Sequence, residues 1–415
     1  MILHYYQQFF TGPKAPGPAT PRKLMRYLAQ AGHEVHVVAT DFNVYNEQSE
    51  PIEEESFAGG GRWTVHRLSS PRRLRRGLRA RLSTYLGFTL PAYRCGKDLP
   101  RPDLVLGSIQ PLFTGVVAER LARYWRAPFL LEIRDLWPDA LVVKQAISPL
   151  QAWPLHRVAN YLYRRAGRIV SLTPGIKRVL VRKGVSVDKI DVFPNGFDAT
   201  ACLTVGGDRA QWRQQFGWGD QLVAVYTGTH VEVTAVDTIV RAAQVLRDRP
   251  DIRFDLFGQG QRKRAVMALA ARLGLTNIHF HDPVPKSQVP TILAAADVAL
   301  MTLFKSPLID IYFENKLVDY MGAGKPILAA LDGMQGELIR RHEVGWVVGS
   351  LDHEGLARLV ARAAAAPHEL PQLGENGRRF ARETLLLDNI LEQYMTRIEQ
   401  VASGKDRAIK AVEII

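Results

Sequence analysis

The chain of 415 residues is 47% hydrophobic and 23% charged, which excludes a disordered or fibrous class and predicts two domains with ordinary cores. Its formal net charge of +13 favours anionic partners such as nucleotide diphosphates, lipid phosphates or nucleic acid. The cysteines, Cys95 and Cys202, are too far apart for a metal-ligand or redox motif, so we expect free thiols in a reducing compartment.

The first ten residues lack a basic leader followed by a sustained apolar region, so we expect no secretory signal. The longest apolar stretch, residues 292–304, is shorter than the roughly 20 residues that span a bilayer. We therefore expect a cytoplasmic protein whose contact with a membrane, if it has any, is peripheral.

Short strands and helices alternate along the first half of the chain. Thr20 and Pro21 open a helical pattern that Gly32 ends, and a β-branched run over 34–40 follows. Further strands are predicted at 103–107, 129–133 and 168–173, with a helix near 114–125. This alternation predicts one doubly wound α/β domain over residues 1–197.

A second series of strands and helices follows a polar linker at 198–219. Its strands are predicted at 222–227, 253–257, 278–281, 298–303, 326–330 and 345–348. These strands predict a second Rossmann-like domain over residues 198–388. Residues 356–365 and 376–401 have helical patterns, and we expect the segment 389–415 to form a C-terminal helix that returns toward the first domain.

Polar residues gather after the predicted strand at 129–133, at the strand end where open α/β sheets usually bind ligands. Arg134 and Asp135 are therefore candidate catalytic residues. The alternative is that they form a structural ion pair that fixes the loop. The loop 11–20 is a weaker candidate, because it matches no phosphate-binding pattern.

In the second half, Gly258 and Gly260 lie between a strand and a helix, and Arg262 and Lys263 follow them. Glycines allow the backbone to approach a phosphate closely, and the cations are near enough to reach it. The alternative is a solvated basic helix start behind a glycine turn.

Lys316 and Asp319 are three residues apart on a predicted helix, so a cation and a carboxylate are expected on one face. A carboxylate can bind two ribose hydroxyls while an ammonium neutralises a diphosphate. The alternative is an ordinary surface ion pair.

Seven segments between residues 5 and 348 carry a resemblance to a known family: 31–35, 134–138, 192–198, 226–229, 258–260, 294–297 and 315–326. Together they resemble the retaining glycosyltransferases of family 4, most of all their bacterial branch for O-antigen, capsule and exopolysaccharide sugars, which includes N-acetylfucosaminyl transferases. The resemblance implies a GT-B architecture, in which two Rossmann-like domains face a central cleft. The N-terminal domain would bind the acceptor and the C-terminal domain the nucleotide sugar.

The resemblance also assigns residues. Asp319 matches the acidic residue that binds the ribose, and Lys316 is placed for the diphosphate, whereas the family's other acidic position falls on Ile311, with Glu314 three residues later. Two basic residues of the family are unmatched in segment 229–232. The candidate donor-binding set is Gly228, Thr229, His230, Gly258, Gly260, Arg262, Lys263, His281, Asn315, Lys316, Asp319 and Glu337, and the candidate catalytic set is Arg134, Asp135, Glu314 and Lys316.

The implied reaction is a front-face displacement in which an acceptor hydroxyl attacks as the nucleoside diphosphate leaves, with a UDP-sugar favoured as donor. It needs no protein nucleophile, no cofactor and no metal, because orientation and positive charge carry it. A GT-B nucleotide-sugar epimerase and an inactive nucleotide-sugar-binding partner of another transferase are the alternatives. Release of nucleoside diphosphate without acceptor-linked product would indicate the first, and binding without turnover the second.

The region Arg72–Arg81 carries six arginines, with leucines near helical spacing over 71–86. A basic amphipathic helix is typical of an anionic membrane surface, and each nearby cation contributes about 1 kcal/mol. A solvated helix packed on its domain and a nucleic-acid site are the alternatives; no recognition module accompanies the charge, which argues against nucleic acid. We therefore expect a polyprenyl-diphosphate-linked saccharide acceptor, and a protein at the inner face of the cytoplasmic membrane.

Overall fold

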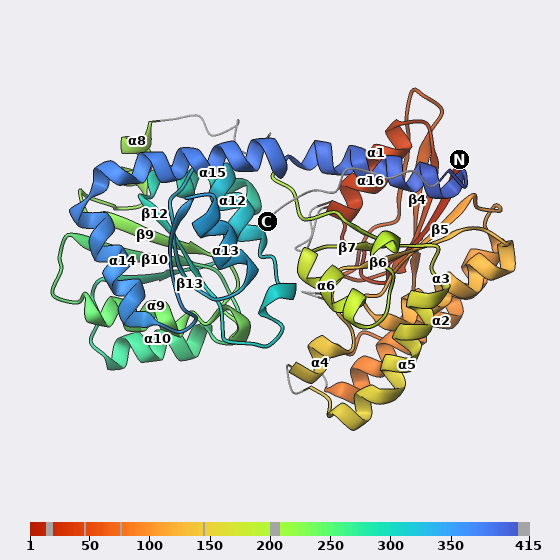
Figure 1. Ribbon diagram of the computed structural model, residues 1–415, viewed down its shortest axis with the longest axis horizontal. Coiled ribbons are helices and arrows are strands. Elements are labelled where there is room, and N and C mark those ends of the chain that lie inside the picture. The colour runs from red at the N-terminus through yellow and green to blue at the C-terminus, as the bar shows by residue number, and fades with distance from the viewer. Residues whose placement is uncertain (14–19, 45–46, 75–76, 144–145, 200–207, 406–415) are drawn as a thin grey trace. The chain divides into compact units, whose positions relative to one another are not determined.

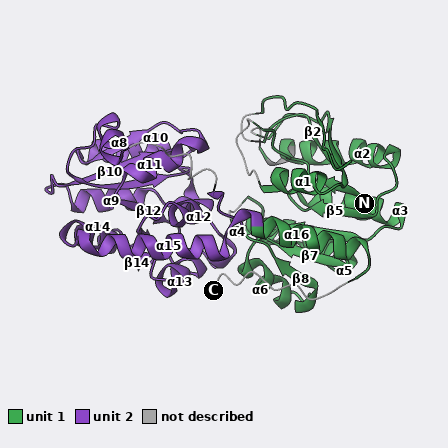
Figure 2. Cartoon of the chain, turned by 90° about the horizontal axis from the view of Figure 1, so that it is seen from above, with its two compact units in different colours: residues 1–194, 389–412 green, residues 195–388, 413–415 purple. Residues whose placement is uncertain are grey.

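A computed structural model describes residues 1–13, 20–44, 47–74, 77–143, 146–199 and 208–405. The chain forms two compact units (Figure 2). Unit 1 comprises Met1–Pro194 together with the segment that begins at Asn389, and unit 2 comprises Asn195–Asp388. Among the described residues, no helix is both long enough and apolar enough to cross a bilayer.

Unit 1 is built on an eight-stranded sheet in the order β3-β4-β2-β1-β5-β6-β7-β8 (Figure 1). All neighbouring strands are parallel except β3 and β4. The strands are β1 (Ile2–Tyr6), β2 (Glu34–Thr40), β3 (Glu53–Ser56), β4 (Arg62–Leu68), β5 (Leu104–Ser108), β6 (Phe129–Ile133), β7 (Arg168–Ser171) and β8 (Ile190–Val192). Every residue of β5 and β6 is buried, as expected for strands covered on both faces.

The helices of unit 1 follow the predicted alternation. They are α1 (Thr20–Gln30), α2 (Leu78–Asp98), α3 (Leu112–Trp125), α4 (Asp139–Val143), α5 (Pro149–Arg165), α6 (Pro174–Arg182) and most of α16 (Leu387–Ala402). On α1 the predicted apolar face, which includes Leu24 and Leu28, is buried. The prediction of a doubly wound α/β fold is confirmed for this unit.

The prediction of an arginine-rich helix over 71–86 is wrong for the first half of that range. The structure begins α2 at Leu78, directly after Gly77, whose φ of 94° is a conformation that favours glycine. The described part of the preceding segment folds back along the helix: the Arg73 amide donates to the Thr84 hydroxyl at 3.3 Å, and Arg81 donates to the Leu74 carbonyl at 2.6 Å. The turn at Gly77 therefore divides the basic region into a loop and a helix start.

Unit 2 contains a six-stranded parallel sheet in the order β11-β10-β9-β12-β13-β14. Its strands are β9 (Leu222–Thr227), β10 (Ile252–Phe257), β11 (Ile278–His281), β12 (Val298–Thr302), β13 (Ile327–Ala330) and β14 (Gly345–Val348). Its helices are α8 (Arg209–Gln215), α9 (Asp237–Val245), α10 (Lys263–Arg272), α11 (Val289–Ala295), α12 (Asn315–Gly322), α13 (Met334–Arg341), α14 (His353–Ala365) and α15 (Leu370–Thr384).

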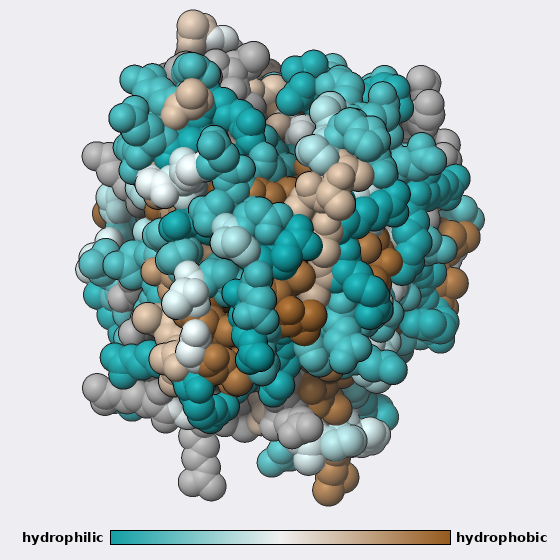
Figure 3. All heavy atoms as spheres, turned by 90° about the vertical axis from the view of Figure 1, so that its left-hand side faces the viewer, coloured by the Kyte–Doolittle hydropathy of each residue, from teal (hydrophilic) through white to brown (hydrophobic). Residues whose placement is uncertain are grey.

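Figure 3, which looks at the molecule from the left-hand side of Figure 1, shows a mostly hydrophilic surface with smaller hydrophobic patches.

The helix predicted over 376–401 is interrupted. The structure ends α15 at Thr384 and begins α16 at Leu387. Between them the backbone pairs with Phe197, whose amide donates to the Leu385 carbonyl at 2.6 Å and whose carbonyl accepts from the Leu387 amide at 2.9 Å. A helix running through this point would lose both hydrogen bonds, so the pairing explains the break.

Most of α16 belongs to unit 1, where specific contacts hold it. The Tyr394 ring stacks on Phe193 at 4.7 Å between centroids. Arg397, whose side chain is only 1% exposed, pairs with Asp191 on β8 at 2.9 Å. Since a buried charge is costly without its partner, this pair fixes the position of α16 along the sheet edge.

Replacing Arg397 with Met should lower the free energy of unfolding of unit 1 by about 3 kcal/mol, because the Asp191 carboxylate, which is only 15% exposed, loses its closest cation and is left with Arg168 at 3.5 Å. Chemical denaturation monitored by circular dichroism measures this loss. The control is Asp248→Asn, which breaks a pair whose side chains are 62% and 92% exposed and should cost less than about 0.5 kcal/mol. Equal effects of the two substitutions would contradict the structural role of Arg397.

Candidate functional site

Two glycine-bearing loops meet at the carboxyl ends of neighbouring strands in unit 2. β9 and β10 end in register at Thr227 and Phe257, and Gly228 and Gly258 follow them directly. Their φ angles are 153° and 152°, and a Cβ on Gly258 would overlap the Gly228 carbonyl. The backbones therefore approach each other in a way that only glycine allows at this position.

Hydrogen bonds join the two loops further along. The His230 amide donates to the Gln259 carbonyl at 3.0 Å, and the His230 carbonyl accepts from the Arg262 amide at 2.9 Å. A Cβ on Gly260 would overlap the His230 backbone. We call the segments 228–230 and 258–260 the glycine cradle; its backbone is fixed by hydrogen bonds of its own, so no ligand is needed to shape it.

Lys316 is the cation beside this cradle. Its side chain is 8% exposed, and its Nζ lies 2.9 Å from the Tyr226 hydroxyl and 3.6 Å from a Glu314 carboxylate oxygen. A Cβ on Gly228 would lie 3.1 Å from the same Nζ. Burial opposes the charge, but Tyr226 and Glu314 prevail and raise the pKa of Lys316, which holds a permanent ammonium next to the glycine turn.

His230 is fully buried in the cradle between the rings of Tyr226 and Phe280, at centroid distances of 5.7 and 6.4 Å. In the described part of the chain neither ring nitrogen has a hydrogen-bond partner. Burial, followed by the charges of Lys263 and Lys316, lowers the pKa of His230 to about 4. The imidazole is therefore neutral at physiological pH and has unused hydrogen-bonding capacity.

The other basic candidates of this region bind protein groups. Lys263 donates to the His281 carbonyl at 2.7 Å and pairs with Asp282 at 3.0 Å. The Arg262 guanidinium lies 3.4 Å from a carboxylate oxygen of Glu232. His281, another candidate for the donor site, places its Nε2 at 2.5 Å from a carboxylate oxygen of Asp255, and its ring stacks on Phe257. Arg262, Lys263 and His281 therefore all bind protein partners in this structure.

Asp319 and Lys316 point to different neighbours, so the shared face expected from their spacing does not form. Asp319 lies 3.6 Å from Lys286 and helps line a small pocket. The other residues lining it are Phe197, Asp198, Val289, Pro290 and Leu293. Burial raises the pKa of the Asp319 carboxyl. The pocket combines apolar walls with a carboxylate, which are the groups that bind a base and a ribose.

The remaining donor-site candidates are side chains of the loop after β9, of α12 and of α13. Thr229, Asn315 and Glu337 are exposed. Ile311 is buried, and the Glu314 amide donates to the Gln335 side chain at 2.8 Å. Glu314 therefore directly precedes α12 with its carboxylate 3.6 Å from Lys316, not at the place of Ile311. Among the described residues, no three His, Cys, Asp or Glu side chains are grouped closely enough to hold a metal ion.

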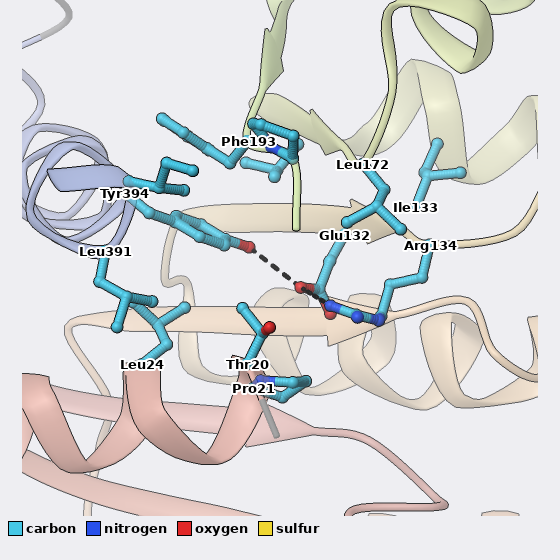
Figure 4. A pocket seen from close by; sticks show the side chains of 13 residues that line it. Thr20, Pro21, Leu24, Glu132, Ile133, Arg134, Leu172, Phe193, Leu391 and Tyr394 are labelled. Atoms are coloured by element: carbon cyan, nitrogen blue, oxygen red, sulfur yellow. Dashed lines mark hydrogen bonds and ion pairs between the residues drawn. The ribbon is translucent and has the colours of Figure 1, made fainter. Parts of the chain in front are cut away.

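In unit 1, Arg134 belongs to a buried polar cluster (Figure 4). Its Nη1 lies 3.5 Å from a Glu132 carboxylate oxygen, and the two side chains are 8% and 5% exposed. Tyr5 donates to the same carboxylate at 2.7 Å, and the Tyr394 hydroxyl of α16 lies 3.5 Å from it. Burial opposes the charge on Arg134, but the Glu132 carboxylate prevails and raises the pKa of the guanidinium.

This cluster differs from the pair expected within the sequence motif. Asp135 accepts a hydrogen bond from Gln110 at 2.5 Å. Tyr5 and Tyr394 were missed because Tyr394 is distant in sequence and no local pattern connects it with Glu132. The cluster lies beside a narrow cavity lined by Thr20, Pro21, Leu24, Leu172 and Leu391.

Both halves of the chain match models of protein families. Residues 17–196 match a model described as "Glycosyl transferase 4-like domain". Residues 221–365 match a model described as "Glycosyl transferases group 1". Together the two models cover most of the chain and both of its units.

Known proteins are similar to this chain over nearly its whole length. The putative colanic acid biosynthesis glycosyl transferase WcaI of Escherichia coli K12 is 25% identical over 91% of this chain and 94% of its own length. The structure of Anabaena Alr3699/HepE in complex with UDP matches with a TM-score of 0.69 at 16% identity, covering 96% of this chain and 99% of that one. WaaG, a glycosyltransferase of lipopolysaccharide biosynthesis, matches with a TM-score of 0.69 at 18% identity over 96% and 99% of the two chains. The predicted GT-B fold is confirmed by these likenesses.

The neutral state of His230 predicts a specific pH dependence of stability. Its pKa is about 4 in the folded chain and 6.5 in a model peptide, so between these values the unfolded chain binds a proton that the folded chain does not. The free energy of unfolding should therefore fall as the pH drops from about 6.5 to about 4, with His230 contributing about 3 kcal/mol of the loss.

The variant His230→Gln should lose correspondingly less stability over this window, because its side chain does not titrate. Urea unfolding at pH 7 and at pH 4, for both proteins, measures the difference. His4 and His66, whose pKa values are also lowered by burial, titrate in both proteins and cancel in the comparison. An identical loss in the two proteins would show that His230 is not held neutral.

Proposed function

Because the chain belongs to glycosyltransferase family 4, we propose that it transfers a sugar, with retention, from a UDP-sugar to a polyprenyl-diphosphate-linked saccharide in the assembly of a surface polysaccharide. Membership of the family itself implies a nucleotide sugar as the donor. UDP is favoured because Alr3699/HepE has been crystallised with UDP and with UDP-glucose. The likeness to WcaI, named for colanic acid biosynthesis, supports a polysaccharide product.

The observation that carries the proposal is the buried ammonium of Lys316 beside the glycine cradle. The acceptor hydroxyl attacks the anomeric carbon from the side on which the diphosphate departs, so negative charge develops on the leaving oxygens. Lys316, held 2.9 Å from Tyr226, is pre-positioned to neutralise that charge without reorganising in the transition state. Stabilisation of this kind typically contributes about 10²- to 10³-fold in rate.

The nucleoside part of the donor is assigned to the pocket that holds Asp319. Its carboxylate accepts from two ribose hydroxyls, and Val289, Pro290 and Leu293 offer apolar contact to the base. Donor binding then replaces the 3.6 Å contact between Asp319 and Lys286, which is a weak pair because the Lys286 side chain is 68% exposed.

The roles of the two units follow from this assignment. The C-terminal domain, residues 198–388, binds the nucleotide sugar. The N-terminal domain, residues 1–197, binds the acceptor, together with α16, most of which belongs to unit 1; the predicted C-terminal segment 389–415 ends outside the described residues. Arg134 acts through its buried pair with Glu132, so it positions the loop after β6, and Asp135, which accepts from Gln110, is the candidate carboxylate that this loop offers to an acceptor.

Ile311 supports a second candidate, an inactive partner protein that binds a nucleotide sugar for another transferase. The apolar side chain is buried where the family has an acidic residue, and Glu314 is directed to Lys316. Such a protein would bind the donor but release no nucleoside diphosphate. The epimerase alternative would release it without an acceptor-linked product.

The acceptor would be reached at the inner face of the cytoplasmic membrane through the Arg72–Arg81 region. Leu82 and Leu86 of α2 are 41% and 45% exposed, and the described arginines of the region, Arg72, Arg73 and Arg81, are exposed too, so apolar and basic groups are available together. Arg72 also pairs with Asp41 at 3.1 Å, which anchors the basic loop to the sheet. Nucleic acid is not part of this proposal.

A panel of uridine, guanosine, adenosine and thymidine diphosphate sugars tests the donor site. We expect the melting temperature to rise with uridine diphosphate sugars, and titration calorimetry to show at least a tenfold weaker affinity in Lys316→Met, because an ammonium–diphosphate contact is lost. Lys97→Met removes an exposed lysine of unit 1 and should bind as the wild type does. Circular dichroism verifies that each variant is folded. No response to any nucleotide, or equal affinity of folded Lys316→Met, would contradict the assignment.

A further inference from the structure

The first turn of α5 exposes two large apolar side chains to solvent. Leu150 is 85% exposed and Trp153 is 60% exposed. They are three residues apart, so they lie on neighbouring positions of one helix face. The turn is held by a capping box, in which Ser148 accepts from the Gln151 amide at 3.3 Å and the Gln151 side chain accepts from the Ser148 amide at 2.9 Å. The capped helix end thus holds a leucine and a tryptophan in water, where exposed apolar surface is unfavourable. Such a patch indicates an interaction site that a partner or a membrane covers.

The chain around this turn is free of acidic residues. Residues 140–187 contain nine lysines and arginines and no aspartate or glutamate. Residues 57–97, which include the Arg72–Arg81 region and nearly all of α2, contain ten and likewise no acid. Arg157 lies over the Trp153 ring at 5.3 Å. Lys183, Arg165 and Arg168 pair with carboxylates from outside the segment, and the other basic residues leave it with an excess of positive charge. The combination of exposed apolar groups with this excess matches an anionic lipid interface.

Contacts within unit 1 attach both segments to the same edge of its sheet. Tyr85 of α2 packs edge-on against Trp137, just beyond β6, at 5.7 Å, and Gln8, just beyond β1, donates to the Thr84 carbonyl at 3.0 Å. The second segment is attached through α4: Asp139 of α4 pairs with Lys183 at 2.9 Å and lies 3.9 Å from His156 of α5. Figure 1 draws α2, α4 and α5 along the lower side of unit 1.

The shared edge is the one formed by the carboxyl ends of β1 and β6, where open α/β sheets bind their ligands. A bilayer that covered Leu150 and Trp153 would therefore meet unit 1 beside the loop that carries Asp135. A second copy of this chain is a poor occupant, because it would bring one basic surface against another.

We propose that Leu150 and Trp153 are a second membrane-insertion point, which acts with Leu82 and Leu86 of α2 to hold the acceptor edge of unit 1 on an anionic bilayer. The inference rests on the proposed function for its lipid-linked acceptor, but the docking itself requires neither donor nor acceptor. Insertion of the two side chains removes their apolar surface from water, while the flanking arginines remain at the headgroups.

Flotation with lipid vesicles tests the proposal on the full chain. The wild type should float with vesicles of phosphatidylcholine and phosphatidylglycerol and much less with phosphatidylcholine alone. The double variant Leu150→Glu/Trp153→Glu should lose about tenfold or more in partitioning to the anionic vesicles, since two buried apolar side chains are replaced by carboxylates. Val245→Glu/Met267→Glu, which alters exposed apolar residues of unit 2 (53% and 43%), is the matched control and should float as the wild type does.

Trp153→Phe separates insertion from charge. It should still float, but the part of the tryptophan fluorescence that brominated acyl chains quench in the wild type should be missing. Wild-type flotation of the double glutamate variant, or unchanged quenching in Trp153→Phe, would overturn the proposal. A shift from dimer to monomer in the double variant, seen by sedimentation, would also overturn it by identifying a second copy as the occupant.

Affinity for uridine diphosphate reports the proposed function separately. The double glutamate variant should bind it as the wild type does, because the substitutions lie in unit 1. If the wild type binds no nucleotide yet floats, the proposed function fails and the docking stands. If it binds nucleotide yet does not float, the docking fails alone.

Discussion

The proposed donor site depends on one steric constraint, the close approach of Gly228 and Gly258 at the ends of β9 and β10. Any side chain on Gly258 would overlap the Gly228 carbonyl, and both residues have φ near 150°. This approach lets the two loops exchange backbone hydrogen bonds through His230. It also brings Lys316 of α12 against Gly228, so a helix, two strands and two turns converge on the space where a phosphate can meet backbone and cation together.

Two basic side chains at the glycine cradle differ in charge: Lys316 is charged and His230 is neutral. Lys316 stays an ammonium because Tyr226 and Glu314 outweigh its burial, whereas burial and the two nearby lysines keep His230 neutral. The positive charge is therefore concentrated on one fixed group, and the imidazole beside it has free hydrogen-bonding capacity. In the proposed reaction this arrangement suits a departing diphosphate, because a pre-organised charge stabilises the transition state without the cost of reorientation. An incoming diphosphate would also favour protonation of His230.

Local sequence patterns predicted much of this molecule, and their limits are physical. Strand and helix alternation, the glycine turns and the apolar face of α1 depend on neighbours in the chain. The spacing of Lys316 and Asp319 indicated a common helix face, but it could not show that Tyr226, some 90 residues earlier, draws the lysine to β9. The contact of Tyr394 with Glu132 joins residues 262 positions apart, and no local pattern could predict it. The turn at Gly77 broke a helix that leucine spacing alone favoured.

The most direct test of the account is a transfer reaction with a UDP-sugar labelled in its sugar and a polyprenyl-diphosphate-linked saccharide in anionic vesicles. We predict that label enters the lipid fraction in proportion to the UDP released, and that the new linkage keeps the anomeric configuration of the donor. Release of UDP without label in the lipid would contradict transfer and indicate the epimerase. Binding of donor with no release from any nucleotide sugar would contradict transferase activity and leave the partner protein as the function.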